Sequence, residues 1–108
     1  MEGLERLREE LGYFSGKKVF VTGHTGFKGS WLVAILKELG SEVFGFSLPP
    51  PTNPSLYMLA NVSEGIHEKI GDIRDFALLN KSIKDFQPEV IIHLAAQPLV
   101  MEGYRDPI

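Results

Sequence analysis

The sequence contains no cysteine, and this absence excludes several kinds of chemistry for the chain. Disulfide bonds, thiolate metal sites and cysteine nucleophiles all require a residue that is not there. Histidine occurs only three times, as His24, His67 and His93, and these positions are too far apart to suggest a local ligand cluster. We therefore expect no metal site in this chain.

The sequence also has no long hydrophobic run and no cluster of positive charge. No segment approaches the roughly 20 apolar residues that cross a bilayer. Residues 1–11 alternate Glu and Arg with Leu instead of forming the apolar core of a signal peptide. These patterns indicate a cytoplasmic protein with no membrane partner. The formal net charge is −3 and the Lys and Arg residues are scattered, so we expect no nucleic-acid partner.

The composition that remains is typical of one globular domain. The chain has 108 residues, of which 44% are hydrophobic and 23% are charged. Short apolar runs rich in β-branched and aromatic residues predict four strands, at 17–22, 42–46, 67–70 and 90–95. The run at 90–95 has the clearest pattern of a buried strand. Helical spacing of apolar residues predicts helices at 2–11, 30–39 and 76–86, with a short helical segment within 55–61.

The alternation of strands and helices predicts an α/β fold, a Rossmann-type parallel sheet with helices on both faces. We expect an incomplete sheet of about four strands in the order 3-2-1-4. Residues 1–108 are then the N-terminal part of a single NAD(P)-binding Rossmann domain, whose remainder lies outside this chain together with the substrate domain. Because such a sheet leaves an edge strand unpaired, we also expect a homo-oligomer.

A glycine-rich turn, "VTGHTGFKGSWL", joins the first predicted strand to the next helix. Gly23, Gly26 and Gly29 suit a turn with unusual backbone angles, in which a pyrophosphate can approach the main chain. The helix that follows directs its N–H groups and the positive end of its dipole at such an anion. The motif predicts dinucleotide binding, with a purely structural loop as the alternative. Lys28 is equally compatible with a phosphate contact and a solvated position, and Trp31 is expected in the core.

The second predicted strand ends without the charged residue that usually selects the cofactor. Residues 45–48 contain neither an acid for the ribose hydroxyls of NAD nor an arginine for the 2′-phosphate of NADP. Ser47 offers a neutral hydrogen bond at most, so this position leaves the choice between NAD and NADP open. Asp72 follows the third predicted strand, and we expect it to contact adenine. Its alternative role is an N-cap for the next helix, which Asp75 fills better.

The fourth predicted strand carries one histidine and ends in two small residues. His93 is interpreted as a core residue with a hydrogen-bond partner, in preference to a general base. Ala95 and Ala96 leave space for a cofactor outside the carboxyl ends of the strands.

Four segments together, "VTGHTGFKGSWL", "PPPTNPSLY", "GDIRD" and "HLAAQPLV", resemble the CDP-glucose 4,6-dehydratases. These are nucleotide-sugar enzymes of the extended short-chain dehydrogenase/reductase group, and the resemblance spans residues 14–107. It implies a lyase that uses NAD and converts CDP-glucose to CDP-4-keto-6-deoxyglucose. In such a cycle the sugar is oxidised at carbon 4, loses water between carbons 5 and 6, and is reduced at carbon 6.

The resemblance also implies roles for individual residues. The cofactor pyrophosphate would lie against Gly23, Thr25, Gly26, Phe27, Lys28 and Gly29. The adenine would contact Asp72 and Ile73, and the inner face of the cofactor would contact Leu94, Ala95 and Ala96. His24 is a further cofactor-side candidate. A substrate-facing loop would begin with Gln97, Pro98 and Leu99.

The chain departs from the family pattern in two ways. After "QPLV" the family has arginine and serine where this sequence has residues 101–103, "MEG". The catalytic Tyr-x-x-x-Lys pair of the family lies beyond Ile108, and Tyr13 and Lys17 match its spacing only by chance, because they precede the first strand. We therefore expect no catalytic residue in this chain and no activity from it alone. The alternatives are a non-catalytic nucleotide-binding module and another nucleotide-sugar epimerase or dehydratase.

Overall fold

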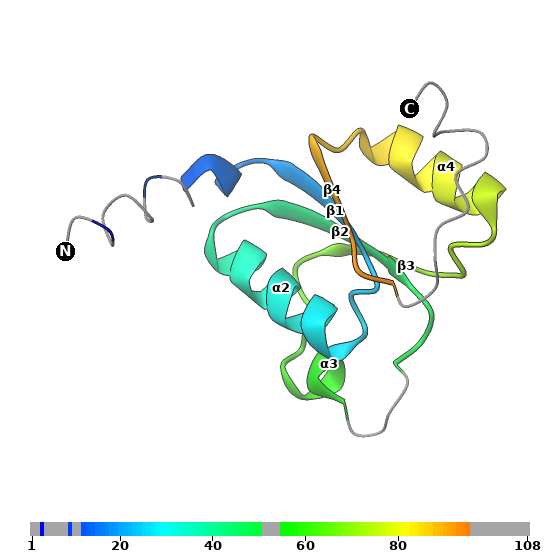
Figure 1. Cartoon of the computed structure of the whole chain (residues 1–108), viewed down its shortest axis with the longest axis horizontal. Helices are drawn as coiled ribbons and strands as arrows, with labels where there is room; N and C mark the ends of the chain where they lie inside the picture. Colours follow the sequence, from blue (N-terminus) through cyan, green and yellow to red (C-terminus); the bar gives the residue numbers. More distant parts are fainter. Residues whose placement is uncertain (1–2, 4–8, 10–11, 51–54, 96–108) are drawn as a thin grey trace.

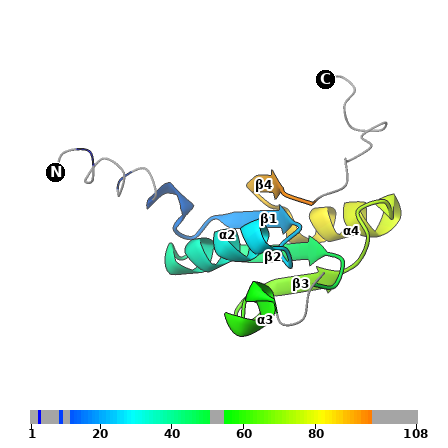
Figure 2. The ribbon, with the colours of Figure 1, turned by 60° about the horizontal axis from the view of Figure 1, so that its bottom comes forward.

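The fold is a four-stranded parallel sheet with helices on both faces (Figure 1). The computed structural model describes residues 12–50 and 55–95, together with Gly3 and Glu9. The strands are β1 (Lys18–Thr22), β2 (Glu42–Ser47), β3 (His67–Ile70) and β4 (Val90–His93). Their order is β3-β2-β1-β4, which confirms the predicted order 3-2-1-4, and Figure 2 shows all four arrows pointing the same way.

The register brings apolar residues of neighbouring strands side by side. Phe20 in β1 lies between Phe44 of β2 and Ile91 of β4. Side chains of successive residues point to opposite faces of a strand, so β1 supplies apolar groups to both layers. All of Val19–Thr22 is buried. A strand that is apolar on both faces is the expected centre of a parallel sheet.

The helices are η1 (Gly12–Phe14), α2 (Phe27–Glu38), α3 (Leu56–Leu59) and α4 (Phe76–Phe86). The bounds of α4 agree with the prediction, and Asp75 caps this helix by accepting a hydrogen bond of 3.2 Å from the N–H of Leu78. In contrast, α2 begins three residues before the predicted start at residue 30, because its first turn carries no buried apolar side chain to mark it. The predicted helix at 2–11 lies, apart from Gly3 and Glu9, outside the described residues. No helix within the described part of the chain is long and apolar enough to cross a membrane.

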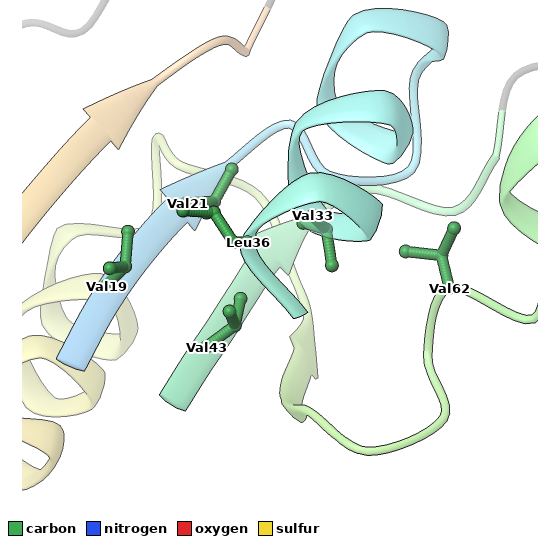
Figure 3. Close-up of a cluster of buried hydrophobic side chains, with 6 residues drawn as sticks. All are labelled: Val19, Val21, Val33, Leu36, Val43 and Val62. Atoms are coloured by element: carbon green, nitrogen blue, oxygen red, sulfur yellow. The ribbon is translucent and has the colours of Figure 1, made fainter. Parts of the chain in front are cut away.

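Two hydrophobic layers hold the helices against the sheet. Helices α2 and α3 cover one face and α4 covers the other (Figure 1). Figure 3 shows the first layer, made of Val19, Val21, Val33, Leu36, Val43 and Val62. The second layer is formed by Phe20, Phe46, Ile73, Leu79 and Phe86. Both layers contain side chains of β1 and β2, so these two strands are packed on both faces. This packing fixes the positions of their carboxyl ends.

The expectation that Trp31 is buried is wrong. Its side chain is 53% exposed, because α2 turns a different face to the sheet. That face consists of the buried residues Gly29, Ser30, Val33 and Leu36, whose small first members let the helix approach β1 closely. Trp31 lies on the opposite side of α2, where apolar side chains also recur at helical spacing but are exposed.

The expectation of a fully buried fourth strand is also wrong. Strand β4 ends at His93 and alternates between half-buried and exposed residues, with Ile91 52% exposed. It pairs with β1 on one side, and within the described residues no strand lies on its other side. His93 is therefore an exposed residue and not a core residue. Its Nδ1 lies 2.6 Å from the Oγ1 atom of Thr22, so it does have a hydrogen-bond partner.

Candidate functional site

A cavity of about 280 Å³ opens at the carboxyl ends of the parallel strands. This is the edge at which open α/β sheets bind ligands. Four segments of chain meet there: the glycine turn after β1 and the segments that follow β2, β3 and β4. The lining residues are Gly23, Thr25, Gly26, Ser47, Leu48, Pro49, Gly71, Asp72, Ile73, Leu94 and Ala95.

At two glycines of the turn, Gly23 and Gly29, the surrounding backbone leaves no room for a side chain. Gly23 has φ +82°, and a Cβ there would lie 2.6 Å from the backbone nitrogen of Ala95. A Cβ at Gly29 would lie 2.0 Å from the carbonyl oxygen of Gly23. These atoms belong to the backbone and cannot rotate away. Gly23 and Gly29 therefore bring β1, β4 and the first turn of α2 closer together than any side chain would allow.

Gly26 differs from the other two glycines because the protein leaves space beside it. Among the described residues, the only atom within 4 Å of a Cβ at this position would be the carbonyl oxygen of Gly23, at 3.6 Å. Gly26 lines the cavity and is the N-cap residue of α2, with no side chain to cap the helix. The first turn of α2 contains no acidic residue. An anionic group such as a pyrophosphate fits this position, because it can approach the helix N-terminus without meeting a Cβ or a negative charge.

The end of β2 contributes neutral polar groups to the cavity. The Thr25 Oγ1 atom donates a hydrogen bond of 2.8 Å to the carbonyl oxygen of Leu48 and lies 2.9 Å from the Ser47 Oγ atom. Both hydroxyls are buried. This geometry agrees with the expected neutral role of Ser47, and it also fixes the glycine turn against the end of β2.

Asp72 lines the cavity after β3 and does not cap a helix. The N-cap alternative is excluded, because Asp75 makes the capping hydrogen bond of α4. The Asp72 carboxylate instead accepts hydrogen bonds from the backbone N–H and the guanidinium of Arg74, the shortest at 2.6 Å. These hydrogen bonds lower the pKa of Asp72 below its usual value, so the carboxylate is ionised at neutral pH. It can accept further hydrogen bonds but cannot donate one.

The structure brings together only part of the predicted site. Leu94 and Ala95 line the cavity as expected. Phe27 and Lys28 are exposed at the start of α2 and do not line it, and Phe27 is 69% exposed. The predicted contacts of residues 96–99 (Ala96, Gln97, Pro98 and Leu99) lie outside the described residues.

His24 lies elsewhere than expected. Its side chain is fully buried and is not part of the cavity lining, so the structure does not support a direct contact with a cofactor in this cavity. Tyr13 and Lys17 lie at the amino end of β1, at the other end of the strand from the glycine turn. Lys17 Nζ lies 4.7 Å from the centre of the Tyr13 ring. The two residues therefore lie away from the edge of the sheet at which the cavity opens.

The sequence reasoning missed three lining residues: Leu48, Pro49 and Gly71. All three lie within two residues of the carboxyl end of a strand, which is the signal that could have identified them. Gly71 also has a packing reason, because a Cβ there would lie 3.0 Å from the Leu78 Cδ2 atom and 3.2 Å from the Phe46 Cζ atom.

Comparisons with known proteins agree with this geometry. The sequence profile described as GDP-mannose 4,6 dehydratase matches residues 20–108. The CDP-glucose 4,6-dehydratase of Salmonella typhimurium is 52% identical over 99 residues. This alignment covers 92% of the chain but only 28% of that relative. The chain thus spans a little over a quarter of the relative that it matches.

Solved structures show the same arrangement of strands and helices. The Bordetella bronchiseptica enzyme WbmH in complex with NAD+ has a TM-score of 0.63 and 30% identity, covering 82% of this chain and 29% of that one. The UDP-glucose 4-epimerase from Brucella ovis in complex with NAD has a TM-score of 0.60 and 26% identity. This second match covers 85% of this chain and 26% of the epimerase.

Proposed function

The chain belongs to the GDP-mannose 4,6-dehydratase family, and on that premise we propose that it is the NAD-binding part of a CDP-glucose 4,6-dehydratase. One observation carries the proposal: the glycine turn forms a cradle at the cavity, in which Gly26 leaves room for an anion at the helix N-terminus. The identity of 52% to a CDP-glucose 4,6-dehydratase supports the substrate. The two NAD complexes with the same fold support the cofactor.

The lining residues divide into those for the phosphates and those for the rest of the cofactor. Gly23, Thr25 and Gly26 border the phosphate position, and Gly29 holds the turn in shape. Asp72 and Ile73 form the adenine side, while Leu94 and Ala95 form the inner wall. When bound, NAD supplies a reversible oxidation of the sugar. The residues of this chain bind and orient the cofactor and exclude water from it.

The cavity favours NAD over NADP. At the end of β2 it offers the hydroxyls of Thr25 and Ser47, and no cationic side chain is among the described residues that line it. The 2′-phosphate of NADP carries charge that a cation would have to compensate. The guanidinium of Arg74 is nearby in sequence but already pairs with Asp72.

We also propose that residues 1–108 are the N-terminal part of one Rossmann domain. In this proposal the rest of the domain, the substrate domain and the catalytic residues are supplied by further sequence, and this chain alone is inactive. The half-exposed edge strand β4 supports the proposal, because a continued sheet would pair with it. Assembly of the complete protein into a homo-oligomer remains a prediction.

The test is turnover by the complete protein that carries this chain. We expect it to convert CDP-glucose to a 4-keto-6-deoxy product without added reductant, and to use UDP-glucose and dTDP-glucose at least about 100-fold less efficiently. Turnover of UDP-glucose or dTDP-glucose without turnover of CDP-glucose would instead identify another nucleotide-sugar dehydratase or epimerase. NAD binding without turnover of any sugar would identify a non-catalytic module.

Replacing Asp72 with alanine tests the adenine side of the cavity. We expect the affinity of the complete protein for NAD to fall about tenfold, because a charged acceptor is removed from the cavity wall. The midpoint of thermal unfolding should change little, since the pair with Arg74 is exposed. Asp85→Ala is the matched control, because it also breaks a surface ion pair, with Lys81 at 2.9 Å, on the outside of α4. Equal NAD affinity of the two variants would exclude a role of Asp72 in adenine binding.

A further inference from the structure

The second residue of the glycine turn, His24, has a role that its position between two glycines does not reveal. We propose that His24 is a positioning residue, whose buried hydrogen bond to Glu68 holds the glycine turn in the shape that receives the cofactor phosphates. Cofactor binding is then coupled to α3 and β3, which lie outside the cavity. The inference rests on the proposed function only in taking the ligand to be an adenine dinucleotide.

The fully buried His24 belongs to a polar network whose other members are half-buried. Its Nε2 atom lies 2.7 Å from the Oε2 atom of Glu68 in β3. The hydroxyl of Tyr57 in α3 donates a hydrogen bond to the same Glu68 oxygen. The rings of His24 and Tyr57 meet edge to face, with centroids 5.6 Å apart. Three elements far apart in sequence are thus joined at one carboxylate.

The imidazole of His24 is closely packed. A Cβ at Gly45 of β2 would lie 2.5 Å from the His24 Cγ atom, so the ring packs directly on the backbone of β2. The Nδ1 atom is buried and has no hydrogen-bond partner among the described residues. Burial also lowers the pKa of His24, which keeps the ring neutral. Because the Glu68 carboxylate only accepts hydrogen bonds, Nε2 carries the proton, and among the described residues the ring makes its hydrogen bond only to Glu68.

The backbone of His24 transmits this restraint to the turn. Its carbonyl oxygen accepts a hydrogen bond of 2.9 Å from the Ser30 Oγ atom, in the first part of α2. The next residue, Thr25, is bonded on the other side to Leu48 at the end of β2. Two hydrogen bonds therefore anchor the turn, that of the His24 side chain with Glu68 and that of Thr25 with Leu48. Gly23 lies one residue and Gly26 two residues from His24. Losing the Glu68 hydrogen bond would release one anchor and leave a half-buried carboxylate with one partner fewer.

The experiment compares ligands with and without phosphates on the complete protein. We expect His24→Leu to weaken ADP binding about tenfold while adenosine binding changes less than about twofold, because only the phosphates lie on the turn. His24→Gln, whose amide can still donate to Glu68, should restore ADP affinity to within about threefold of that of the unaltered protein.

The double variant His24→Leu/Glu68→Leu should bind ADP no more weakly than the weaker single variant, since each single substitution already breaks the same interaction. His67→Gln is the matched control, because His67 makes a similar 2.9 Å pair with Glu42 at the surface of the neighbouring strands.

Several results would overturn the inference. Equal losses for ADP and adenosine would mean that His24 only stabilises the fold, and unchanged ADP affinity would mean that the anchor is not needed. If His24→Leu does not fold, Glu68→Leu must show the same difference between ADP and adenosine. Failure of the unaltered protein to bind either ligand would contradict the proposed function instead. In that case amide exchange decides: the Gly26 and Ser30 amides must exchange faster in His24→Leu than in His67→Gln, and equal rates overturn the inference.

Discussion

Replacing Gly29 with alanine should destabilise the protein by about 3 kcal/mol, although alanine is the better helix former. In an open helix the same change stabilises by up to about 1 kcal/mol. Here the new Cβ would lie 2.0 Å from the Gly23 carbonyl oxygen and 2.7 Å from the His24 Cα atom. Both are backbone atoms, so α2 must move away from β1. We expect urea unfolding to show the loss of stability, and NAD binding to disappear.

The neighbouring glycine provides the control for this prediction. The new Cβ of Gly26→Ala would meet only one atom of the described part of the chain, at 3.6 Å, so the free energy of unfolding should change by less than about 0.5 kcal/mol. Its affinity for NAD should still fall about tenfold, because the methyl group occupies the approach to the helix N-terminus. A Gly29→Ala protein as stable as Gly26→Ala would show that the contact between α2 and the turn is not required.

The second large effect is expected in the second hydrophobic layer, between the sheet and α4. Phe20→Ala should lower the free energy of unfolding by about 3 to 5 kcal/mol, the usual range for a fully buried phenylalanine. The Phe20 side chain is completely buried in the central strand β1 and stacks on Phe44, with ring centroids 5.0 Å apart. Domains are commonly stable by only about 5 to 15 kcal/mol, so this loss can unfold much of the population.

Urea unfolding of Phe20→Ala should be compared with that of Phe27→Ala. Phe27 is an exposed phenylalanine at the start of α2, so its replacement should change stability by less than about 0.5 kcal/mol. A difference between the two variants below about 1.5 kcal/mol would contradict the importance of this layer. Phe27→Ala also tests whether this exposed ring contributes to NAD binding, which the cavity lining does not suggest.

Local pattern was sufficient to predict the elements of this fold. The bounds of β3 (His67–Ile70) and α4 (Phe76–Phe86) agree with the prediction, and the strand order follows from the alternation of strands and helices. The carboxyl-end position of Asp72 was likewise predictable, because it depends on which residue follows a strand. Such features depend on a residue and its near neighbours in the chain.

Burial was less predictable, because it depends on what lies opposite a residue in space. Trp31 and β4 have the composition of core segments, yet both are half exposed in the described structure. Apolar periodicity shows that a face could be buried but not which element covers it. The covering element comes from another part of the sequence.

The glycine turn, residues 23–29, has features of both kinds: some were predictable from the local sequence, and others depend on the tertiary structure. The sequence by itself predicted a turn for a phosphate group, because the spacing of Gly23, Gly26 and Gly29 between a strand and a helix has few other uses. Only the tertiary structure decided that Gly23 and Gly29 are needed for packing while Gly26 has open space beside it at the cavity. It also decided that His24 faces Glu68 and not the cavity. Gly23 and His24 contact Gly45, Glu68 and Ala95, which are 21 to 72 positions away along the chain, whereas Gly29 meets Gly23, only six positions away.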